Sequence, residues 1–291
     1  MFEGTYVAIV TPFKNGQIDE EALRNLVDFL IENKVEGIVP CGTTGESATL
    51  SYDEHIEVIK IVKDEAKGRC QIIAGTGSNS TNEAIYLTKE AESLKVDGAL
   101  LITPYYNKPN QEGLYRHFMA VAKNTKLPIV LYNVPSRTGV NMKPETVARL
   151  FKDCENIVAI KEASGDVNLS GKILELTDGK ISVLSGDDAL TLPLISVGAR
   201  GVISVTANIL PYEVSEMVRY ALNGDIQKAR ELYYKLFKIN KVMFIDTNPI
   251  PVKTALYYMG KVNKEWRLPL CETTLEKEEI IKNTLKEYGL I

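Results

Sequence analysis

A lysine that closes a short apolar run is the residue of this sequence best suited to covalent chemistry. Lys161 follows the run Ile157-Val158-Ala159-Ile160, which is typical of a buried β-strand, and precedes Glu162. An uncharged lysine amine is a nucleophile that forms a Schiff base with a ketone. The structural alternative is a lysine that ends a strand by reaching solvent or by pairing with Glu162. The pattern alone leaves both interpretations open.

A pair of threonines between two glycines is a second candidate site. Residues 41–47 read CGTTGES, so Thr43 and Thr44 lie between Gly42 and Gly45. Glycine lets the backbone approach a ligand closely, and the N–H groups and hydroxyls of such a loop can converge on a small anion. A tight turn between a strand and a helix would use the same residues for backbone freedom and capping. The two interpretations are evenly balanced.

Phenols and one arginine follow two later apolar runs. Tyr105 and Tyr106 come after one run, and Tyr132 and Arg137 lie at and beyond the end of the next. Tyrosines often pack at a rim with wet hydroxyl groups, and a loop arginine is more often solvated or ion-paired than a ligand clamp. Each of these residues is weak evidence alone, and the case for a site depends on their shared position after the ends of apolar runs.

Composition narrows the classes of partner. The chain has 34 basic and 38 acidic residues with no dense basic tract, which argues against nucleic acid. No run approaches the roughly 18 apolar residues of a membrane span, and the start lacks a signal-peptide pattern. Four widely spaced cysteines fit a reducing compartment. We expect a soluble, cytoplasmic protein.

Other catalytic constellations are weaker. His55 and His117 are the only histidines, and both fall in expected helices, so a histidine-rich metal site is excluded. Gly75-Thr76-Gly77 lacks the third glycine of a dinucleotide loop. Asp187-Asp188 could bind a magnesium ion, but these acids suit a helix start better. We expect neither a metal nor a nucleotide cofactor.

The elements that must position these residues alternate regularly along the chain. Eight β-rich runs are each followed by a segment with helical periodicity. The expected strands are 6–10, 35–40, 71–74, 98–102, 129–132, 157–160, 181–184 and 201–205. Helices are expected from Asp19, after Ser51 and Ser80, and over 111–122, 144–151, 169–176, 189–197 and 211–222. Ser51 with Glu54, and Ser80 with Glu83, have capping-box spacing.

Eight strand–helix units match the count of a closed barrel. Their apolar strands suit a sheet covered on both sides, so we expect a (β/α)₈ TIM barrel over residues 1–223. Residues 224–291 add helical patterns at 226–244, 251–258 and 275–287. This C-terminal helical region is expected to pack on the barrel because no low-complexity linker precedes it. In such a barrel, the candidate residues would meet at the carboxyl ends of the strands.

Taken together, Gly42-Thr43-Thr44-Gly45-Glu46, residues 132–139 (YNVPSRTG) and Lys161 resemble the pyruvate-dependent lyases of the dihydrodipicolinate synthase and N-acetylneuraminate lyase superfamily. The resemblance covers nearly the whole chain, including residues 185–188 and 201–204. It implies that Lys161 forms an imine with pyruvate and that no other cofactor is needed. The resemblance further implies that Thr43 and Thr44 bind the carboxylate of pyruvate, that Gly186 and Ile203 are also substrate-binding, and that Tyr132, Thr44 and Tyr106 form a proton relay.

The choice of second substrate depends on Arg137. In the synthases of this superfamily, the matching arginine binds the carboxylate of aspartate-4-semialdehyde, and the product is 4-hydroxytetrahydrodipicolinate. A guanidinium forks onto a carboxylate, which a sugar polyol does not require. Arg137 therefore favours the synthase. The alternative is an aldolase that cleaves N-acetylneuraminate or 2-keto-3-deoxygluconate through the same imine, and a catalytically silent barrel is a further rival.

The resemblance also implies regulation and assembly. Relatives that lysine inhibits bind it at a dimer interface, where the matching residues here are Ser47, Ala48, His55, Asn79, Glu83 and Tyr105. Tyr52 stands where those relatives often have histidine. Tyr106 is expected to enter the site of a neighbouring subunit, and the expected assembly is a homotetramer made of two tight dimers.

Overall fold

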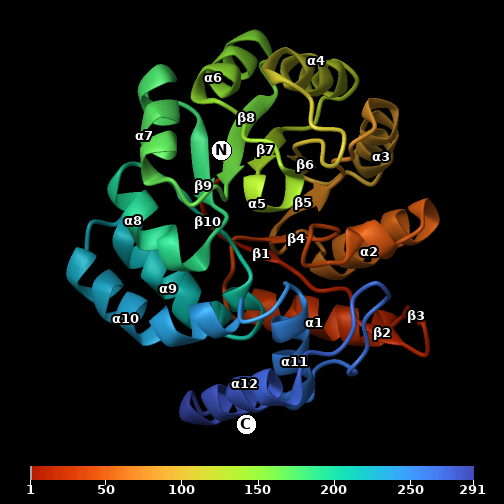
Figure 1. Cartoon of the computed structure of the whole chain (residues 1–291), viewed down its shortest axis with the longest axis vertical. Coiled ribbons are helices and arrows are strands. Elements are labelled where there is room, and N and C mark those ends of the chain that lie inside the picture. The colour runs from red at the N-terminus through yellow and green to blue at the C-terminus, as the bar shows by residue number, and fades with distance from the viewer. Residues whose placement is uncertain (1) are drawn as a thin grey trace.

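The chain folds into a closed barrel of eight parallel strands. The computed structural model describes residues 2–291, and in it β1 pairs with both β4 and β10, so that the sheet closes on itself. Figure 1 shows the helices arranged around these strands. The strands are β1 (Gly4–Ala8), β4 (Gly37–Val39), β5 (Gln71–Gly75), β6 (Gly98–Ile102), β7 (Ile129–Asn133), β8 (Ile157–Glu162), β9 (Ser182–Ser185) and β10 (Gly201–Ser204). The predicted (β/α)₈ barrel and its eight strands are confirmed.

The expected helices are present, with one error of detail at a helix start. Asp19 caps α1, and Ser51 and Glu54 form the predicted capping box. Ser80 precedes α3, but its side chain makes no capping bond; the Ser80 N–H donates to Ser78 Oγ, and that hydroxyl donates to the Glu83 carboxylate. The helices are α1 (Glu20–Glu32), α2 (Tyr52–Ala66), α3 (Thr81–Ser93), α4 (Gln111–Ala122), α6 (Pro144–Asp153), α7 (Val167–Leu176), α8 (Thr191–Ser196) and α9 (Pro211–Leu222).

Short elements that were not predicted lie mainly in the loops after the strands. A hairpin of β2 (Phe13–Lys14) and β3 (Gln17–Ile18) turns at Asn15-Gly16, where both residues have positive φ. An Asn-Gly pair is a strong hairpin signal that could have revealed it. The remaining short elements are α5 (Pro135–Thr138) and three 3₁₀ turns, η1 (Ser47–Thr49), η2 (Asp188–Leu190) and η3 (Thr206–Asn208).

Side chains alternate between the inside and the outside of the barrel. One buried apolar cluster fills the interior, whereas Ile160 belongs to a second cluster between the sheet and the helices. Since successive residues of a strand face opposite sides, Lys161 faces the interior with Ala159. The interior cluster contains Phe2, Tyr6, Ala8, Val39, Ile73, Leu100, Val130, Tyr132, Val134, Ala159, Leu184 and Ile203.

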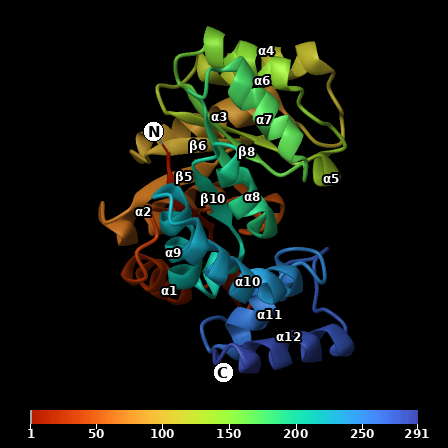
Figure 2. The same ribbon diagram turned by 90° about the vertical axis from the view of Figure 1, so that its left-hand side faces the viewer.

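The C-terminal helices share a core with one side of the barrel. They are α10 (Ile226–Val242), α11 (Ile250–Tyr258) and α12 (Leu275–Glu287). Leu236, Val252 and Ile281 lie in the same buried cluster as Val7 and Leu23 of the barrel side. Figure 2 shows this region at the bottom of the molecule, beneath the barrel. The C-terminal helical region that the sequence predicts is therefore present and packed.

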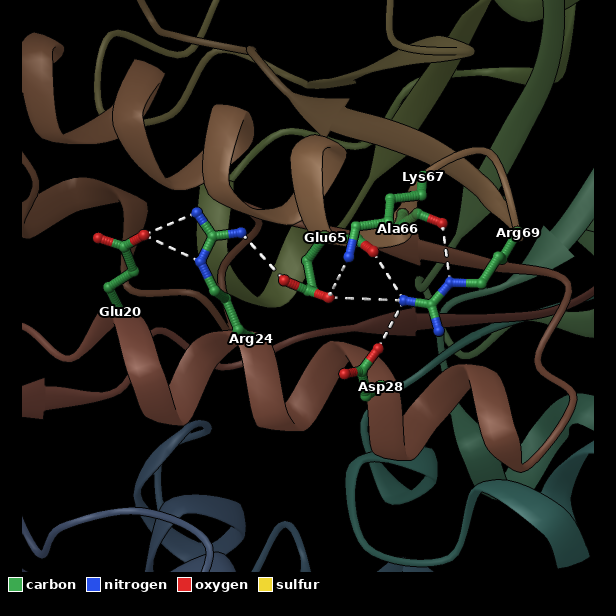
Figure 3. Close-up of polar contacts among 7 residues, drawn as sticks. All are labelled: Glu20, Arg24, Asp28, Glu65, Ala66, Lys67 and Arg69. Atoms are coloured by element: carbon green, nitrogen blue, oxygen red, sulfur yellow. Dashed lines mark hydrogen bonds and ion pairs between the residues drawn. The ribbon is translucent and has the colours of Figure 1, made fainter.

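A network of ion pairs joins two neighbouring helices on the surface. Arg24 of α1 lies between Glu20 and Glu65, and Arg69 donates to Asp28 and to the Glu65 backbone carbonyl (Figure 3). These charged side chains are partly exposed, so solvent and salt screen them. The network therefore aligns α1 with α2, while the apolar core supplies most of the stability. None of the described helices is long and apolar enough to span a membrane.

Burial of His117 predicts a pH-dependent stability. Its Nδ1 lies 2.9 Å from Thr81 Oγ1, and burial lowers the pKa of His117 to about 4. The unfolded imidazole, with a pKa of about 6.5, takes up a proton before the folded one does, so stability falls as the pH drops from about 6.5 towards 4. We expect a loss of about 1–2 kcal/mol between about pH 7 and pH 5, and a smaller loss in His117→Leu.

Melting temperatures of both proteins across this pH range would check the prediction. His55, whose pKa is also lowered by burial, remains in the variant and would leave part of the slope. Equal slopes in the two proteins would contradict the role of His117.

Candidate active site

The Lys161 side chain lies inside the carboxyl end of the barrel. Lys161 is 6% exposed, and its Nζ lies 4.3 Å from the centre of the Tyr132 ring. The two residues face each other across the β7–β8 ladder. Within residues 2–291, Lys161 makes no ion pair, and Glu162 faces the opposite side of the strand. The structure therefore contradicts the alternative of a solvated or Glu162-paired lysine, and it supports a buried amine.

A hydrogen-bonded pair outside the barrel fixes the two strands that carry Tyr132 and Lys161. Asn133 and Glu162 are the next partners along the ladder, and Asn133 Nδ2 donates to Glu162 Oε2 over 3.0 Å. The Ser164 N–H also donates to Glu162. Burial raises the pKa of the Glu162 carboxyl, and these donors oppose the shift. This pair holds the register that keeps Tyr132 beside Lys161.

Two further predicted residues border the lysine. A methyl group added at Gly186 would lie 3.1 Å from Lys161 Cε, so the absence of a side chain there makes room for the lysine stem. Ile203 is 1% exposed and packs in the interior cluster that includes Tyr132. Gly186 follows β9, and Ile203 lies near the end of β10. Both thus lie at the carboxyl ends of neighbouring strands.

The loop after β4 forms two overlapping turns. The N–H groups of Gly45 and Glu46 donate to Gly42 and Thr43 carbonyls, respectively. Those of Thr43 and Thr44 have no acceptor within the described part of the chain. Two adjacent unpaired donors beside a buried Thr44 hydroxyl are suited to an anion. The anion-site interpretation is therefore supported in part, because the other amides of the loop are used in the turns.

Contacts from distant segments hold this loop. Thr11 Oγ1 donates to the Gly45 carbonyl, and Lys253 of α11 pairs with Glu46 in a fully buried ion pair. The Arg267 N–H donates to the second Glu46 oxygen over 3.2 Å. The Thr44 hydroxyl accepts from Asn248 Nδ2 over 3.0 Å. The C-terminal region thereby fixes the position of the loop.

Arg137 lies at the rim of the same end of the barrel. It belongs to α5 and is exposed, and its Nη2 donates to the Asn248 carbonyl over 3.1 Å. Among residues 2–291, Arg137 has no carboxylate partner. The structure therefore contradicts the alternative of an internally ion-paired loop arginine. The remaining guanidinium donors are available to an incoming group.

A cavity of about 490 Å³ opens beside these residues. Thr43, Tyr132, Arg137 and Asn248 lie on its wall, and Tyr132 also contacts the Lys161 amine. Ser47, Ala48, His55, Glu83 and Tyr105, which the sequence assigned to a second site, line the same cavity. The Asn79 side chain donates to the Tyr105 carbonyl.

Tyr106 is not brought to this cavity by its own chain. Its side chain is 89% exposed, and its backbone has a φ of 71°, an uncommon value for a residue with a side chain. The positive φ turns the chain after β6. The predicted relay of Tyr132, Thr44 and Tyr106 is therefore not assembled within one chain.

Several residues of the site were missed by sequence reasoning. Asn248 contacts Thr44 and Arg137, from which it is separated by 204 and 111 residues, and Lys253 lies 207 residues from Glu46. The Asn248-Pro249-Ile250-Pro251 segment marks a break in helical pattern, but no local signal reveals its long-range partners.

The fold and the placement of polar residues define a class of protein. Lysine, tyrosine, threonine and arginine side chains gather at the carboxyl ends of strands in a closed (β/α)₈ barrel, where barrel enzymes have their active sites. The chain thus has the architecture of a (β/α)₈-barrel enzyme.

Comparison with known proteins identifies the family. A profile of the dihydrodipicolinate synthetase family matches residues 1–288. The chain is 57% identical over 291 residues to the 4-hydroxy-tetrahydrodipicolinate synthase of Geotalea uraniireducens, with both proteins covered completely. The chain therefore belongs to the dihydrodipicolinate synthetase family.

Solved structures agree with this assignment. The chloride-inhibited dihydrodipicolinate synthase from Acinetobacter baumannii, complexed with pyruvate, superposes with a TM-score of 0.98 at 48% identity and full coverage of both chains. The enzyme from Cyanidioschyzon merolae with lysine bound gives a TM-score of 0.97 at 41% identity, covering 100% of this chain and 99% of that one.

The space beside Lys161 predicts the effect of a single methyl group. In Gly186→Ala, the new Cβ would lie 2.6 Å from Ala163 Cβ, so the lysine or its neighbours must shift. Such overpacking costs about 1–3 kcal/mol, and we expect a lower melting temperature. Gly171→Ala is the matched control, since its Cβ meets nothing within 4 Å. Equal melting temperatures for the two variants would contradict this prediction.

Proposed function

We propose that the chain condenses pyruvate with L-aspartate-4-semialdehyde through an imine on Lys161, giving 4-hydroxytetrahydrodipicolinate. The reaction belongs to lysine and diaminopimelate biosynthesis. The buried Lys161 amine beside Tyr132 carries the proposal, because a desolvated amine inside a barrel mouth is suited to nucleophilic attack on a ketone. Membership of the dihydrodipicolinate synthetase family supports the choice of reaction.

Lys161 supplies the covalent step. Its amine attacks the keto carbon of pyruvate, and loss of water gives a protonated imine. The imine withdraws electrons from the adjacent methyl group, so loss of a proton there yields an enamine. The enamine attacks the aldehyde carbon, and the substrate amine then displaces Lys161 as the ring closes. No external cofactor takes part.

Tyr132, Thr44 and Tyr106 move protons in this proposal. Tyr132 lies against the amine, and the Thr44 hydroxyl is buried at the end of the anion-binding loop. The exposed Tyr106 would complete the relay from a neighbouring subunit across a tight dimer interface. Each proton transfer then passes between hydroxyls, which can both donate and accept.

The pyruvate carboxylate binds at the loop after β4. The unpaired N–H groups of Thr43 and Thr44 and their hydroxyls donate to it, while Gly186 and Ile203 border the three-carbon substrate beside Lys161. Pyruvate bound to the Acinetobacter relative supports this choice of first substrate. The absence of a side chain at Gly186 leaves room for the lysine stem.

Arg137 binds the carboxylate of the second substrate. Its guanidinium lies on the cavity wall without a carboxylate partner among the described residues. A charge-assisted fork of two hydrogen bonds would orient the aldehyde towards the enamine. Turnover of N-acetylneuraminate or 2-keto-3-deoxygluconate, with no turnover of aspartate semialdehyde, would favour the rival sugar-acid aldolase.

The working assembly is a cytoplasmic homotetramer of two tight dimers. The active site spans the barrel, residues 1–223, and the helical region, residues 224–291, because Asn248 reaches both Thr44 and Arg137. Tyr106 can take part in the relay only in the active site of a second subunit. Sedimentation at assay concentration tests the assembly, and an active monomer would contradict it.

Lysine binds to the cavity residues that the resemblance assigns to a dimer interface, and inhibits. Ser47, Ala48, His55, Glu83 and Tyr105 line the cavity, and Asn79 donates to the Tyr105 carbonyl. A lysine-bound relative supports the ligand class. Titration of the turnover rate with lysine tests this site, and an unchanged rate would contradict it.

Borohydride trapping tests the imine. Borohydride reduces an imine to a stable amine, so wild-type protein treated with pyruvate and borohydride should gain the mass of the reduced adduct on Lys161. Lys161→Ala should gain none, because the nucleophile is absent. Intact-mass and peptide-mass spectrometry measure both. Lys172→Ala, which changes an exposed lysine of α7, is the control and should trap like the wild type. Adduct formation in Lys161→Ala would contradict the proposal.

Arg137→Ala separates the two substrates. Pyruvate trapping should persist, because Arg137 takes no part in imine formation, whereas kcat/KM for aspartate semialdehyde should fall about 10²-fold through loss of a charge-assisted contact. Steady-state kinetics with the semialdehyde, alongside the trapping assay, measure the two effects. An equal loss of trapping and of semialdehyde use would contradict this division of roles.

A further inference from the structure

Asn248 joins the two halves of the proposed site. It precedes the first turn of α11 and is 6% exposed. Its side-chain Nδ2 donates to Thr44 Oγ1 over 3.0 Å, and its backbone carbonyl accepts from Arg137 over 3.1 Å. One residue thus touches the threonine proposed for proton transfer and the arginine proposed for the second substrate.

The bond to Thr44 fixes the direction in which that hydroxyl donates. A hydroxyl has one proton and two acceptor lone pairs. Because Asn248 donates into Thr44 Oγ1, the Thr44 proton must point to another acceptor. Within residues 2–291, no protein atom accepts it. The proton is therefore free for a bound group, and Thr43 and Asn248, the neighbours of Thr44, line the cavity together with Tyr132.

The surroundings hold the carboxamide in place. Asn248 Oδ1 is buried and has no partner in the described part of the chain. In this orientation the carboxamide leaves Oδ1 and one N–H unpaired, whereas the reversed amide would leave both N–H donors unpaired and would accept the Thr44 proton. The buried Lys253–Glu46 pair, one turn further along α11, fixes the helix against the loop that carries Thr44.

We propose that Asn248 is a positioning residue whose carboxamide directs the Thr44 proton towards the reacting groups. The inference rests on the proposed function, in which Thr44 relays protons during imine formation. In this proposal Asn248 acts through Thr44 and not by its own contact with the substrate. Its backbone carbonyl separately steadies Arg137, and side-chain substitutions leave that contact intact.

Substitution by aspartate tests the direction of the hydrogen bond. Asn248→Asp keeps the shape but replaces the donor by an acceptor, so the Thr44 proton turns towards residue 248. We expect the rate of imine formation from pyruvate to fall about 10²-fold in Asn248→Asp and about tenfold in Asn248→Ala, where the hydroxyl is merely undirected. In Asn248→Ala, the KM for aspartate semialdehyde should change less than about twofold, since the backbone contact with Arg137 remains and no charge is added.

A double-mutant cycle with Thr44→Val distinguishes positioning from general damage. If Asn248 acts through the hydroxyl, Asn248→Asp should change the imine rate less than about threefold once that hydroxyl is absent. Additive losses would overturn the proposal, as would wild-type imine rates in Asn248→Asp. If the aspartate variant does not fold, Asn248→Ala is used in the same cycle. Melting temperatures establish that every protein is assayed below the temperature at which it unfolds.

The imine readout keeps this inference separate from the choice of aldehyde. Imine formation requires pyruvate alone, so a wild-type chain that traps pyruvate but rejects aspartate semialdehyde contradicts the proposed function and leaves the test of Asn248 valid. A wild-type chain that fails to trap pyruvate overturns both.

Discussion

The alternation of side chains in a closed barrel places the Lys161 amine where chemistry is feasible. Ala159 and Lys161 face inward, and Ile160 and Glu162 face the helices. Closure of the sheet leaves no edge and therefore no freedom for a strand to slip, since a slip of one residue would exchange the two faces. The strand register therefore keeps the Lys161 amine away from bulk water.

Outward residues of the same strands reinforce that register. The Asn133–Glu162 bond lies one step along the ladder from Tyr132 and Lys161, so this inward pair has an outward pair that supports it. Glycine at position 186 then leaves room for the lysine stem. The site is thus prepared by the scaffold before any ligand arrives.

The sequence predicted those parts of the protein that depend on local pattern. Eight apolar runs, each followed by a helix, identified the barrel, and the ends of those runs identified Lys161, Tyr132 and the Thr43-Thr44 loop. The capping box at Ser80 was wrong because the Ser78 hydroxyl accepts from the Ser80 N–H and donates to the Glu83 carboxylate, and so lies between the two groups that the box would join. A spacing rule cannot decide between two neighbouring hydroxyls.

Contacts between distant segments could not be predicted in this way. Asn248 and Lys253 meet Thr44 and Glu46 only because the chain returns to the mouth of the barrel after about 200 residues. Nothing in the pattern of residues 245–253 distinguishes a polar contact at the site from an ordinary loop and helix start. Likewise, the exposed Tyr106 acquires a role only through a second subunit.

The fully buried pair of Glu46 and Lys253 has a consequence for minimal versions of this enzyme. Burial lowers the pKa of Lys253, and the adjacent Glu46 carboxylate opposes that shift. Loss of either side chain would leave the other charge buried without a partner. Excising the helices after α9 would remove Lys253 from the Glu46 loop and Asn248 from Thr44, and it would expose the apolar barrel residues that pack against Leu236, Val252 and Ile281. The eight-unit barrel is therefore not a self-sufficient module, although its strands close without help.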